Sequence, residues 1–386
     1  MIIQFIKKGI SSKAFKPTAA VFLAVLFMIA IPDQFVNPAY KQYEQCKARV
    51  LSVNNIDINS VGVVKYGQQA CKVKILNGSH KGKEYEAINM LSGALNVDKE
   101  FVVGDIALVS IGANAGQDAY KITMVDHYRT NYISIIAAGF VLILIVLAGW
   151  TGLRAVLSFV FTILSIWKVL IPLMLNGVNP IICGALITVI LTTVIIVLVY
   201  GFDKRFISAT IGSLLSTGLT ALISIVFVHL MNIHGAVMDY SESLLYAGYD
   251  LSLTEIFIAS IFIGSSGALM DIAVDITSAI QEVIAANPET TRQAAIRAGM
   301  SVGRNALGTM TTTLLLAYSG SYIALLMVFV AQGTPLIYIL NINYVAAEIL
   351  NILVGSFGLI TVVPFTALIS GTMLPINFTP STLKNK

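Results

Sequence analysis

Two aspartates and a glutamate recur at helical spacing within an apolar stretch, GALMDIAVDITSAIQEV, which runs from Gly267 to Val283. At 100° per residue, Asp271, Asp275, Ser278 and Glu282 lie within one narrow arc of a helix. Two carboxylates one turn apart disfavour simultaneous ionisation, and ionisable groups inside a membrane bundle are costly and usually functional. These four residues are therefore our candidates for a proton or cation relay.

Small residues continue the same stripe toward the start of the helix, at Ser260, Gly264 and Gly267. Small side chains allow a neighbouring helix to approach closely. We therefore expect Gly264 and Gly267 to be helix-packing positions, and the whole stripe to face the interior of a helix bundle. The other faces carry apolar side chains, namely Ile256, Phe262, Leu269, Ile276 and Ile280.

The depth of the acids in a membrane leaves an alternative open. If the span begins near Thr254, Asp271 lies ~26 Å along the helix, close to its far end. The acids would then form an interfacial cluster, paired with Arg292, Arg297 or Arg304 of the next segment.

The segment after the acidic helix carries further polar groups. Asn287-Pro288 breaks the helix, and another predicted span begins near Arg304. Its hydroxyl and amide groups either hydrogen-bond the facing acids or satisfy their own helix backbone, and both alternatives stay open. The predicted supporting polar partners are Arg304, Asn305, Thr309 and Thr312.

One more carboxylate lies in the last apolar segment. Glu348 falls near the outer end of that segment, where we expect it to pair with Lys168, either as a functional pair or as a structural one.

The composition indicates the class of protein. Of the 386 residues, 56% are hydrophobic and only 11% are charged, and the mean hydropathy is +0.83. A soluble protein of this length needs more charge to cover its surface, so the chain is predicted to be a multi-pass membrane protein. Three cysteines and four histidines form no zinc motif, so we expect no metal site and no cofactor.

Eight segments are long and apolar enough to cross a bilayer, because a crossing needs roughly 20 apolar residues. The first follows several lysines and resembles a signal peptide, but Pro32-Asp33-Gln34 is a poor cleavage site, which favours an uncleaved anchor. The segments are 15–32, 131–150, 155–175, 180–201, 206–231, 253–274, 304–330 and 345–371.

The distribution of Lys and Arg predicts the orientation. With both termini in the cytoplasm, the short outer loops 176–179, 232–252 and 331–344 contain no Lys or Arg. The cytoplasmic side then collects Lys7, Lys8, Lys13, Lys16, Arg154, Lys204, Arg205, Arg292, Arg297, Arg304, Lys384 and Lys386.

The chain divides into residues 1–39 with the first span, an extracytoplasmic β domain at 40–128, and a seven-helix membrane domain at 129–386. Alternating strands separated by Asn77-Gly78 and Lys81-Gly82 predict a small all-β barrel of the OB or SH3-like kind. Its location and its lack of a basic, aromatic strip argue against nucleic acid and favour a docking or assembly module. Cys46 and Cys71 form a disulfide or remain buried thiols.

The acidic stretch closely resembles the YibE/F family of bacterial multi-pass membrane proteins when it is taken with GRNALGTMTTTLLLAYSGS and EILNILVGSFGLITVVPFTALISG. The resemblance covers most of the membrane part, and the preceding barrel resembles the longer, YibE-like member. It implies a location in the bacterial plasma membrane and a shorter paralogous, YibF-like membrane partner. An oligomer is also compatible with it.

The acidic span has a weaker resemblance to the proton-relay spans of RND exporters and SecD/SecF proteins. That resemblance matches Asp271 to the relay position and makes Asp275 its companion. The chain departs from those proteins in its eight predicted spans, its small external domain and its lack of an evident membrane lysine opposite the acids.

Three functions compete. The first is a proton- or cation-coupled transporter or transport-assembly subunit that uses the acidic stripe. The second is an enzyme with Ser266 as the nucleophile of a GxSG pattern, but no histidine base follows His234, so we expect no catalytic residues. The third is a non-transporting scaffold that recruits partners through its β domain.

Overall fold

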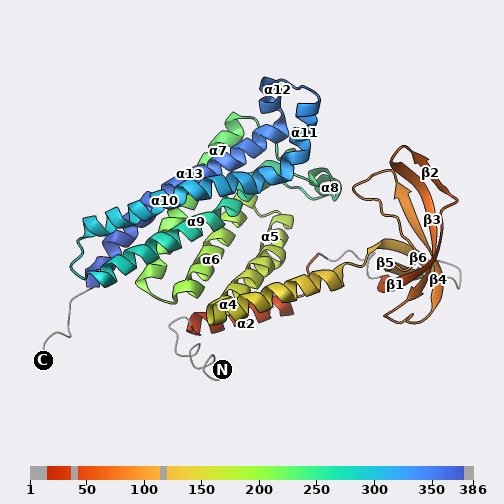
Figure 1. The fold of residues 1–386 in the computed structure, drawn as a ribbon, viewed down its shortest axis with the longest axis horizontal. Coiled ribbons are helices and arrows are strands. Elements are labelled where there is room, and N and C mark those ends of the chain that lie inside the picture. Colours follow the sequence, from red (N-terminus) through yellow and green to blue (C-terminus); the bar gives the residue numbers. More distant parts are fainter. Residues whose placement is uncertain (1–14, 36–41, 114–119, 378–386) are drawn as a thin grey trace. The chain divides into compact units, whose positions relative to one another are not determined.

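The structure is a computed structural model that describes residues 15–35, 42–113 and 120–377. The chain separates into two compact units, one comprising residues 33–143 and the other residues 1–32 together with 144–386. The first unit contains a β barrel, and the second is a bundle of helices (Figure 1).

The barrel is built from six strands: β1 (Tyr43–Asn54), β2 (Ile58–Val61), β3 (Val64–Ile75), β4 (Glu84–Ser92), β5 (Ile106–Ala113) and β6 (Tyr120–His127). The strand order is β1-β5-β6-β4-β3-β2, and an additional β1–β3 pairing closes five of the strands into a ring. Neighbours are antiparallel except β4 and β6, where Ile88 lies opposite Thr123 in a parallel pair. β2 forms only a hairpin on β3.

Buried and exposed residues alternate along the strands, so the barrel has a hydrophobic core of its own. In β3 every second residue from Gln69 to Ile75 is buried, while the intervening residues are exposed. The predicted turns lie between β3 and β4, where Gly78 and Gly82 adopt φ of 78° and 87°, a region that favours glycine. An all-β domain at this position is therefore confirmed.

The two cysteines of the barrel do not form a disulfide. Cys71 of β3 lies opposite Val53 of β1, seven residues along that strand from Cys46, which corresponds to about 23 Å. A disulfide needs Cα atoms roughly 4.4–6.8 Å apart. Both are buried free thiols, and burial raises the pKa of each to about 11, so they are neutral thiols at physiological pH.

Outside the barrel the chain forms long α-helices and several short ones, and the helix that begins at Thr130 belongs to the unit of the barrel up to residue 143. The long helices are α2 (Phe15–Ala30), α4 (Thr130–Ser165), α6 (Pro180–Tyr200), α7 (Lys204–Leu230), α9 (Leu253–Ala286), α10 (Arg292–Ser319) and α13 (Asn343–Met373). The short helices are α5 (Ile171–Leu175), α8 (Ser241–Tyr246), α11 (Ile323–Ala331) and α12 (Leu336–Asn341). The single-turn segments are η1 (Ile166–Leu170), η2 (Gly235–Val237), η3 (Gly320–Tyr322) and η4 (Leu374–Asn377).

Five helices of the described residues are long and apolar enough to cross a membrane, or six when a bent pair counts as one span. The predicted spans 131–150 and 155–175 belong to one 46-residue helical stretch that is broken at Gly149 (φ 59°, ψ −129°). The predicted span 304–330 is a pair, α10 and α11, bent by 71°. Within the described residues, the first predicted span is a helix of 16 residues. Eight crossings therefore remain a prediction.

Helix α9 lies at the centre of the bundle and contacts α6, α7, α10 and α13, as Figure 1 shows for α10 on one side and α6 on the other. Small residues allow α7 and α13 to approach closely. A Cβ atom at Gly358 of α13 would contact Thr220 of α7 and Leu269 of α9. Ser216 of α7 donates a hydrogen bond of 2.6 Å to the Gly358 carbonyl.

Candidate functional site

The apolar face of α9, rather than its acidic stripe, is buried in the bundle. Leu269, Ile272, Ile276 and Ile280 are completely buried. The stripe, in contrast, is on the exposed side of the helix, and its exposed members are Ser260, Gly264, Gly267, Asp271, Asp275 and Glu282. The prediction that the stripe faces the interior of this chain is therefore wrong.

The packing of α9 explains this outcome. Its four isoleucine and leucine side chains join a core to which α13 contributes Leu359, Val362 and Val363, because burying apolar area stabilises the bundle more than burying acids. The stripe is left between two flanking helices. Tyr200 of α6 contacts it at Ser278, and Tyr318 of α10 contacts it at Gly264.

The two glycines of the stripe differ in their surroundings. A Cβ atom at Gly264 would lie 3.0 Å from the Tyr318 hydroxyl, whereas a Cβ atom at Gly267 would meet nothing within 4 Å. Gly267 is therefore not a packing position within this chain, contrary to the prediction.

Two hydrogen bonds between α6 and α9 fix the height of the acids along the bundle. At one end the Asn179 amide donates to the Glu255 carboxylate (2.7 Å), and at the other the Tyr200 and Ser278 hydroxyls are hydrogen-bonded (2.7 Å). Asp271 lies seven residues from Ser278 on the Glu255 side, which is about 10 Å at 1.5 Å per residue.

The other two acids lie nearer that end. On the same scale Asp275 is about 5 Å from Ser278, still on the Glu255 side, and Glu282 is about 6 Å beyond Ser278. The three carboxylates thus occupy three different heights around the Ser278 end of the bundle.

Helix α10 brings its polar residues to these heights without pairing them to the acids. Gly299 and Gly303 of α10 lie against Ile280 and Ile276 of α9, so Arg304 and Asn305 are level with Asp275. Among the described residues, the acids of the stripe form no ion pair with Arg292, Arg297 or Arg304. The hydroxyls of Thr309 and Thr312 donate to carbonyls of their own helix, those of Ala306 and Gly308.

Basic residues gather at the Ser278 end. Arg154 donates a hydrogen bond of 2.8 Å to the Leu198 carbonyl in the last turn of α6. The Arg205 guanidinium lies 4.9 Å from the centroid of the Tyr200 ring and also binds Asp203 (3.0 Å). At the opposite end, Asn179 and Glu255 carry the interhelical contact.

Glu348 contacts different groups from those predicted. The side chains of Tyr322 and Asn351 interact with its carboxyl group. Lys168 donates to the Ile31 carbonyl (2.9 Å), and within the described part of the chain it does not pair with Glu348. The predicted Glu348–Lys168 pair is therefore not formed.

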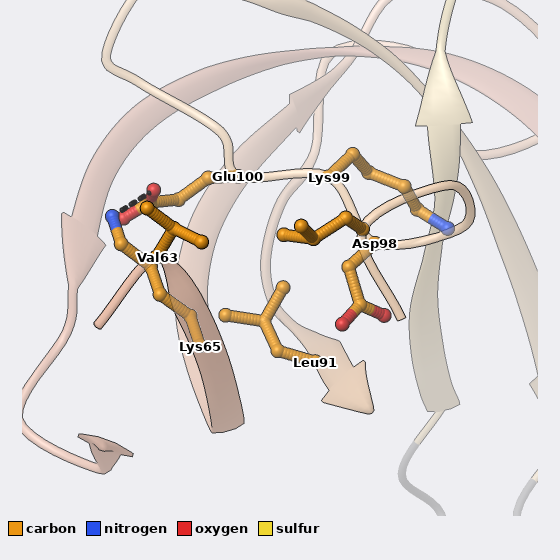
Figure 2. A pocket seen from close by; sticks show the side chains of 7 residues that line it. Val63, Lys65, Leu91, Asp98, Lys99 and Glu100 are labelled. Atoms are coloured by element: carbon orange, nitrogen blue, oxygen red, sulfur yellow. Dashed lines mark hydrogen bonds and ion pairs between the residues drawn. The ribbon is translucent and has the colours of Figure 1, made fainter. Parts of the chain in front are cut away.

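The barrel has a pocket of its own, about 190 Å³ in volume. Figure 2 shows Val63 and Leu91 in this pocket, with the Lys65–Glu100 ion pair on one side and Asp98 and Lys99 on the other. Hydrogen bonds from Ser92 and Gly93 lower the pKa of Asp98, so this loop carries a fixed negative charge.

Comparison with known families matches both parts of the chain. Residues 136–376 match the YibE/F-like proteins, and residues 41–127 match the N-terminal domain of the YibE/F family. The chain belongs to the YibE/F family. No curated protein and no solved structure matches the chain. The first matched range contains the whole acidic helix, so the stripe lies in the part of the chain that defines membership of the YibE/F family.

The sequence reasoning missed the helix-packing residues that position the stripe. Gly299 and Gly303 of α10, spaced as GxxxG, lie tightly against Ile280, Ile276 and Val363. Such a spacing is a recognised signal for close helix contact in membranes. It could have been read from the sequence, where it competes with the longer stripe on α9.

This packing yields a matched pair of variants. Gly303→Leu should lower the melting temperature of the detergent-solubilised protein, because overpacking a tight contact costs about 1–3 kcal/mol. Gly267→Leu should leave it unchanged, because that position opens onto free space. Equal destabilisation by both substitutions would show that the stripe is packed within the single chain.

Proposed function

We propose that this YibE/F-family protein is a subunit of a proton- or cation-coupled membrane transport system, and that Asp271 and Asp275 carry the coupling ion. One observation carries the proposal. Two carboxylates stand one turn apart on the open face of the central helix, without a cationic partner among the described residues. The resemblance of this span to the relay spans of RND and SecD/SecF proteins agrees with that role.

The length of α6 supports a membrane position for Asp271. Its 21 residues rise about 30 Å, which equals the thickness of a bilayer's hydrocarbon core. The Asn179–Glu255 and Tyr200–Ser278 contacts would then mark the two edges of that core. Asp271 would lie about 10 Å inside it, Asp275 near its edge, and Glu282 in water.

We further propose eight crossings in the bacterial plasma membrane, with the Ser278 end in the cytoplasm and the barrel outside. The positions of Arg154, Lys204 and Arg205 at one end of the bundle agree with the positive-inside rule. Lys7, Lys8, Lys13, Lys384 and Lys386, which also entered the orientation argument, lie outside the described residues.

Labelling of single cysteines tests the orientation. A cysteine at Asp239 should react with a membrane-impermeant reagent added to intact cells, and a cysteine at Thr290 should react only after permeabilisation. The reverse pattern would overturn the orientation and the assignment of inner and outer acids.

The open stripe also supports a second membrane subunit. A carboxylate that faces lipid at depth is strongly unfavourable, so another protein surface should cover Asp271 in the membrane. We propose a shorter, YibF-like family member or a second copy of this chain. The Gly267→Leu variant, which is expected to fold, should then lose the complex in co-purification from native membranes.

A scaffold is the second candidate function, and the barrel favours it. The barrel exposes apolar side chains around its pocket, including Val63 and Leu95, which are 78% and 65% exposed. Around the ring the strands follow the order β1, β3, β4, β6, β5 and back to β1. If these five strands are numbered one to five along the chain, the order is one, two, three, five, four, and the parallel pair β4–β6 joins strands three and five. We infer an OB-type barrel from this order, used here to dock a partner.

Proton flux separates the two functions. In liposomes with an imposed membrane potential, flux should fall about 10²-fold or more in the Asp271→Asn/Asp275→Asn variant, the size of effect expected when a proton-transfer group is removed. Asparagine keeps the size of each side chain and removes its titration. Glu282→Gln is the matched control and should retain flux, because that residue lies beyond Ser278.

Unchanged flux in the double variant would contradict the relay and leave the scaffold. Under the scaffold function, the asparagine substitutions would be tolerated wherever packing is preserved.

A further inference from the structure

Glu348 is a carboxyl group without full hydrogen bonding inside a long apolar helix. It is the sixth residue of α13, and its side chain is partly buried. Its Oε1 atom is buried and has no hydrogen-bond partner within the described part of the chain. An ionised oxygen in that position loses its hydration without compensation, whereas a proton on Oε1 removes the charge.

The groups around Glu348 are hydroxyls and an amide, not cations. Tyr322 of η3 and Asn351 of α13 interact with its carboxyl group, and Tyr318 of α10 is close enough to sense its charge. Asp239 and Tyr344 lie next, beside Tyr322. Across the described residues no Lys, Arg or His interacts with Glu348.

A proton fits this site better than a metal ion. Ca²⁺ and Mg²⁺ take about six or more oxygen ligands, and the described residues contain no group of three or more metal-ligating acidic, His or Cys side chains. Tyrosine hydroxyls can both donate and accept a hydrogen bond, so they can pass a proton along while their own charge is unchanged.

Tyr318 of α10 is near both this site and the acidic stripe. Helices α9 and α13 run side by side with Gly355 against Ser265 and Gly358 against Leu269. Glu348 is therefore level with Ile258, thirteen residues or about 20 Å before Asp271. Tyr318, which senses Glu348, has its hydroxyl at Gly264 on the stripe, roughly halfway between the two acids.

We propose that Glu348 is the proton acceptor at the Glu255 end of the bundle, and that Tyr318 connects it to Asp271 along the stripe. The inference rests on the proposed function and supplies the outer half of its pathway. A proton from water binds Glu348 Oε1, and the Tyr318 hydroxyl at Gly264 accepts one proton as it releases its own. About 10 Å of α9 separates Gly264 from Asp271, so water held against the stripe beneath the second subunit would complete the transfer.

Chemical labelling tests the first step without any need for transport. Dicyclohexylcarbodiimide reacts with protonated carboxyl groups in apolar surroundings, and mass spectrometry of the full-length protein in liposomes locates the adduct. Glu348 should be labelled, and labelling should be faster at pH 6 than at pH 8.5. Glu255, which lies at the same end but is hydrogen-bonded to Asn179, should not be labelled.

Flux of variants tests the connection. Glu348→Gln and Tyr318→Phe should lose proton flux, whereas Glu255→Gln should retain it. Labelling of Glu348 should persist in the Asp271→Asn variant, because Glu348 takes up its proton independently of Asp271.

The outcomes separate the two proposals. Unlabelled Glu348, or full flux in Glu348→Gln while Asp271→Asn/Asp275→Asn loses flux, would overturn the inference and leave the proposed function intact. Absence of flux in the unsubstituted protein would count against the proposed function, and pH-dependent labelling would still establish Glu348 as a proton acceptor.

Discussion

A carboxylate in the hydrocarbon core of a membrane costs about 2.5–3.5 kcal/mol or more, and this constraint determines what the central helix can do. The apolar face of helix α9 is completely buried, with Ile272, Ile276 and Ile280 packed among α7, α10 and α13. Its acids are consequently turned to the open side of the chain. A helix with this distribution is stable in a bilayer only if water, protons or another subunit meet the acids.

The rest of the bundle serves to hold that open face in place. Glycines on α10 and α13 bring the neighbouring helices close to the buried side of α9, where Thr277 and Ser370 also share a hydrogen bond of 2.9 Å. Hydroxyls of Tyr200 and Tyr318 flank the stripe from α6 and α10. The site is therefore an exposed helix face of acids and small residues, flanked by two tyrosine hydroxyls, and the opposite face of the same helix is tightly packed with apolar side chains.

Sequence reasoning predicted much of this arrangement, for identifiable physical reasons. The alternation of buried and exposed residues, together with the turn glycines Gly78 and Gly82, was sufficient to predict the barrel. Helical spacing correctly placed Asp271 and Asp275 on one face of α9. The prediction that the acidic face of α9 is buried within this chain was wrong, because small and polar residues indicate contact with protein but do not indicate which chain provides that contact. The long stretch broken only at Gly149 shows why span counting by hydropathy alone is insufficient.

The central claim is that Asp271 and Asp275 exchange a proton within the membrane. Infrared difference spectroscopy of the protein in lipid, recorded across a pH titration, tests it most directly, because a protonated carboxyl group has its own carbonyl stretching band. The account predicts a band that titrates reversibly, is reduced in Asp271→Asn and is abolished at that frequency in the double variant. Spectra identical in the unsubstituted and double-variant proteins would contradict it.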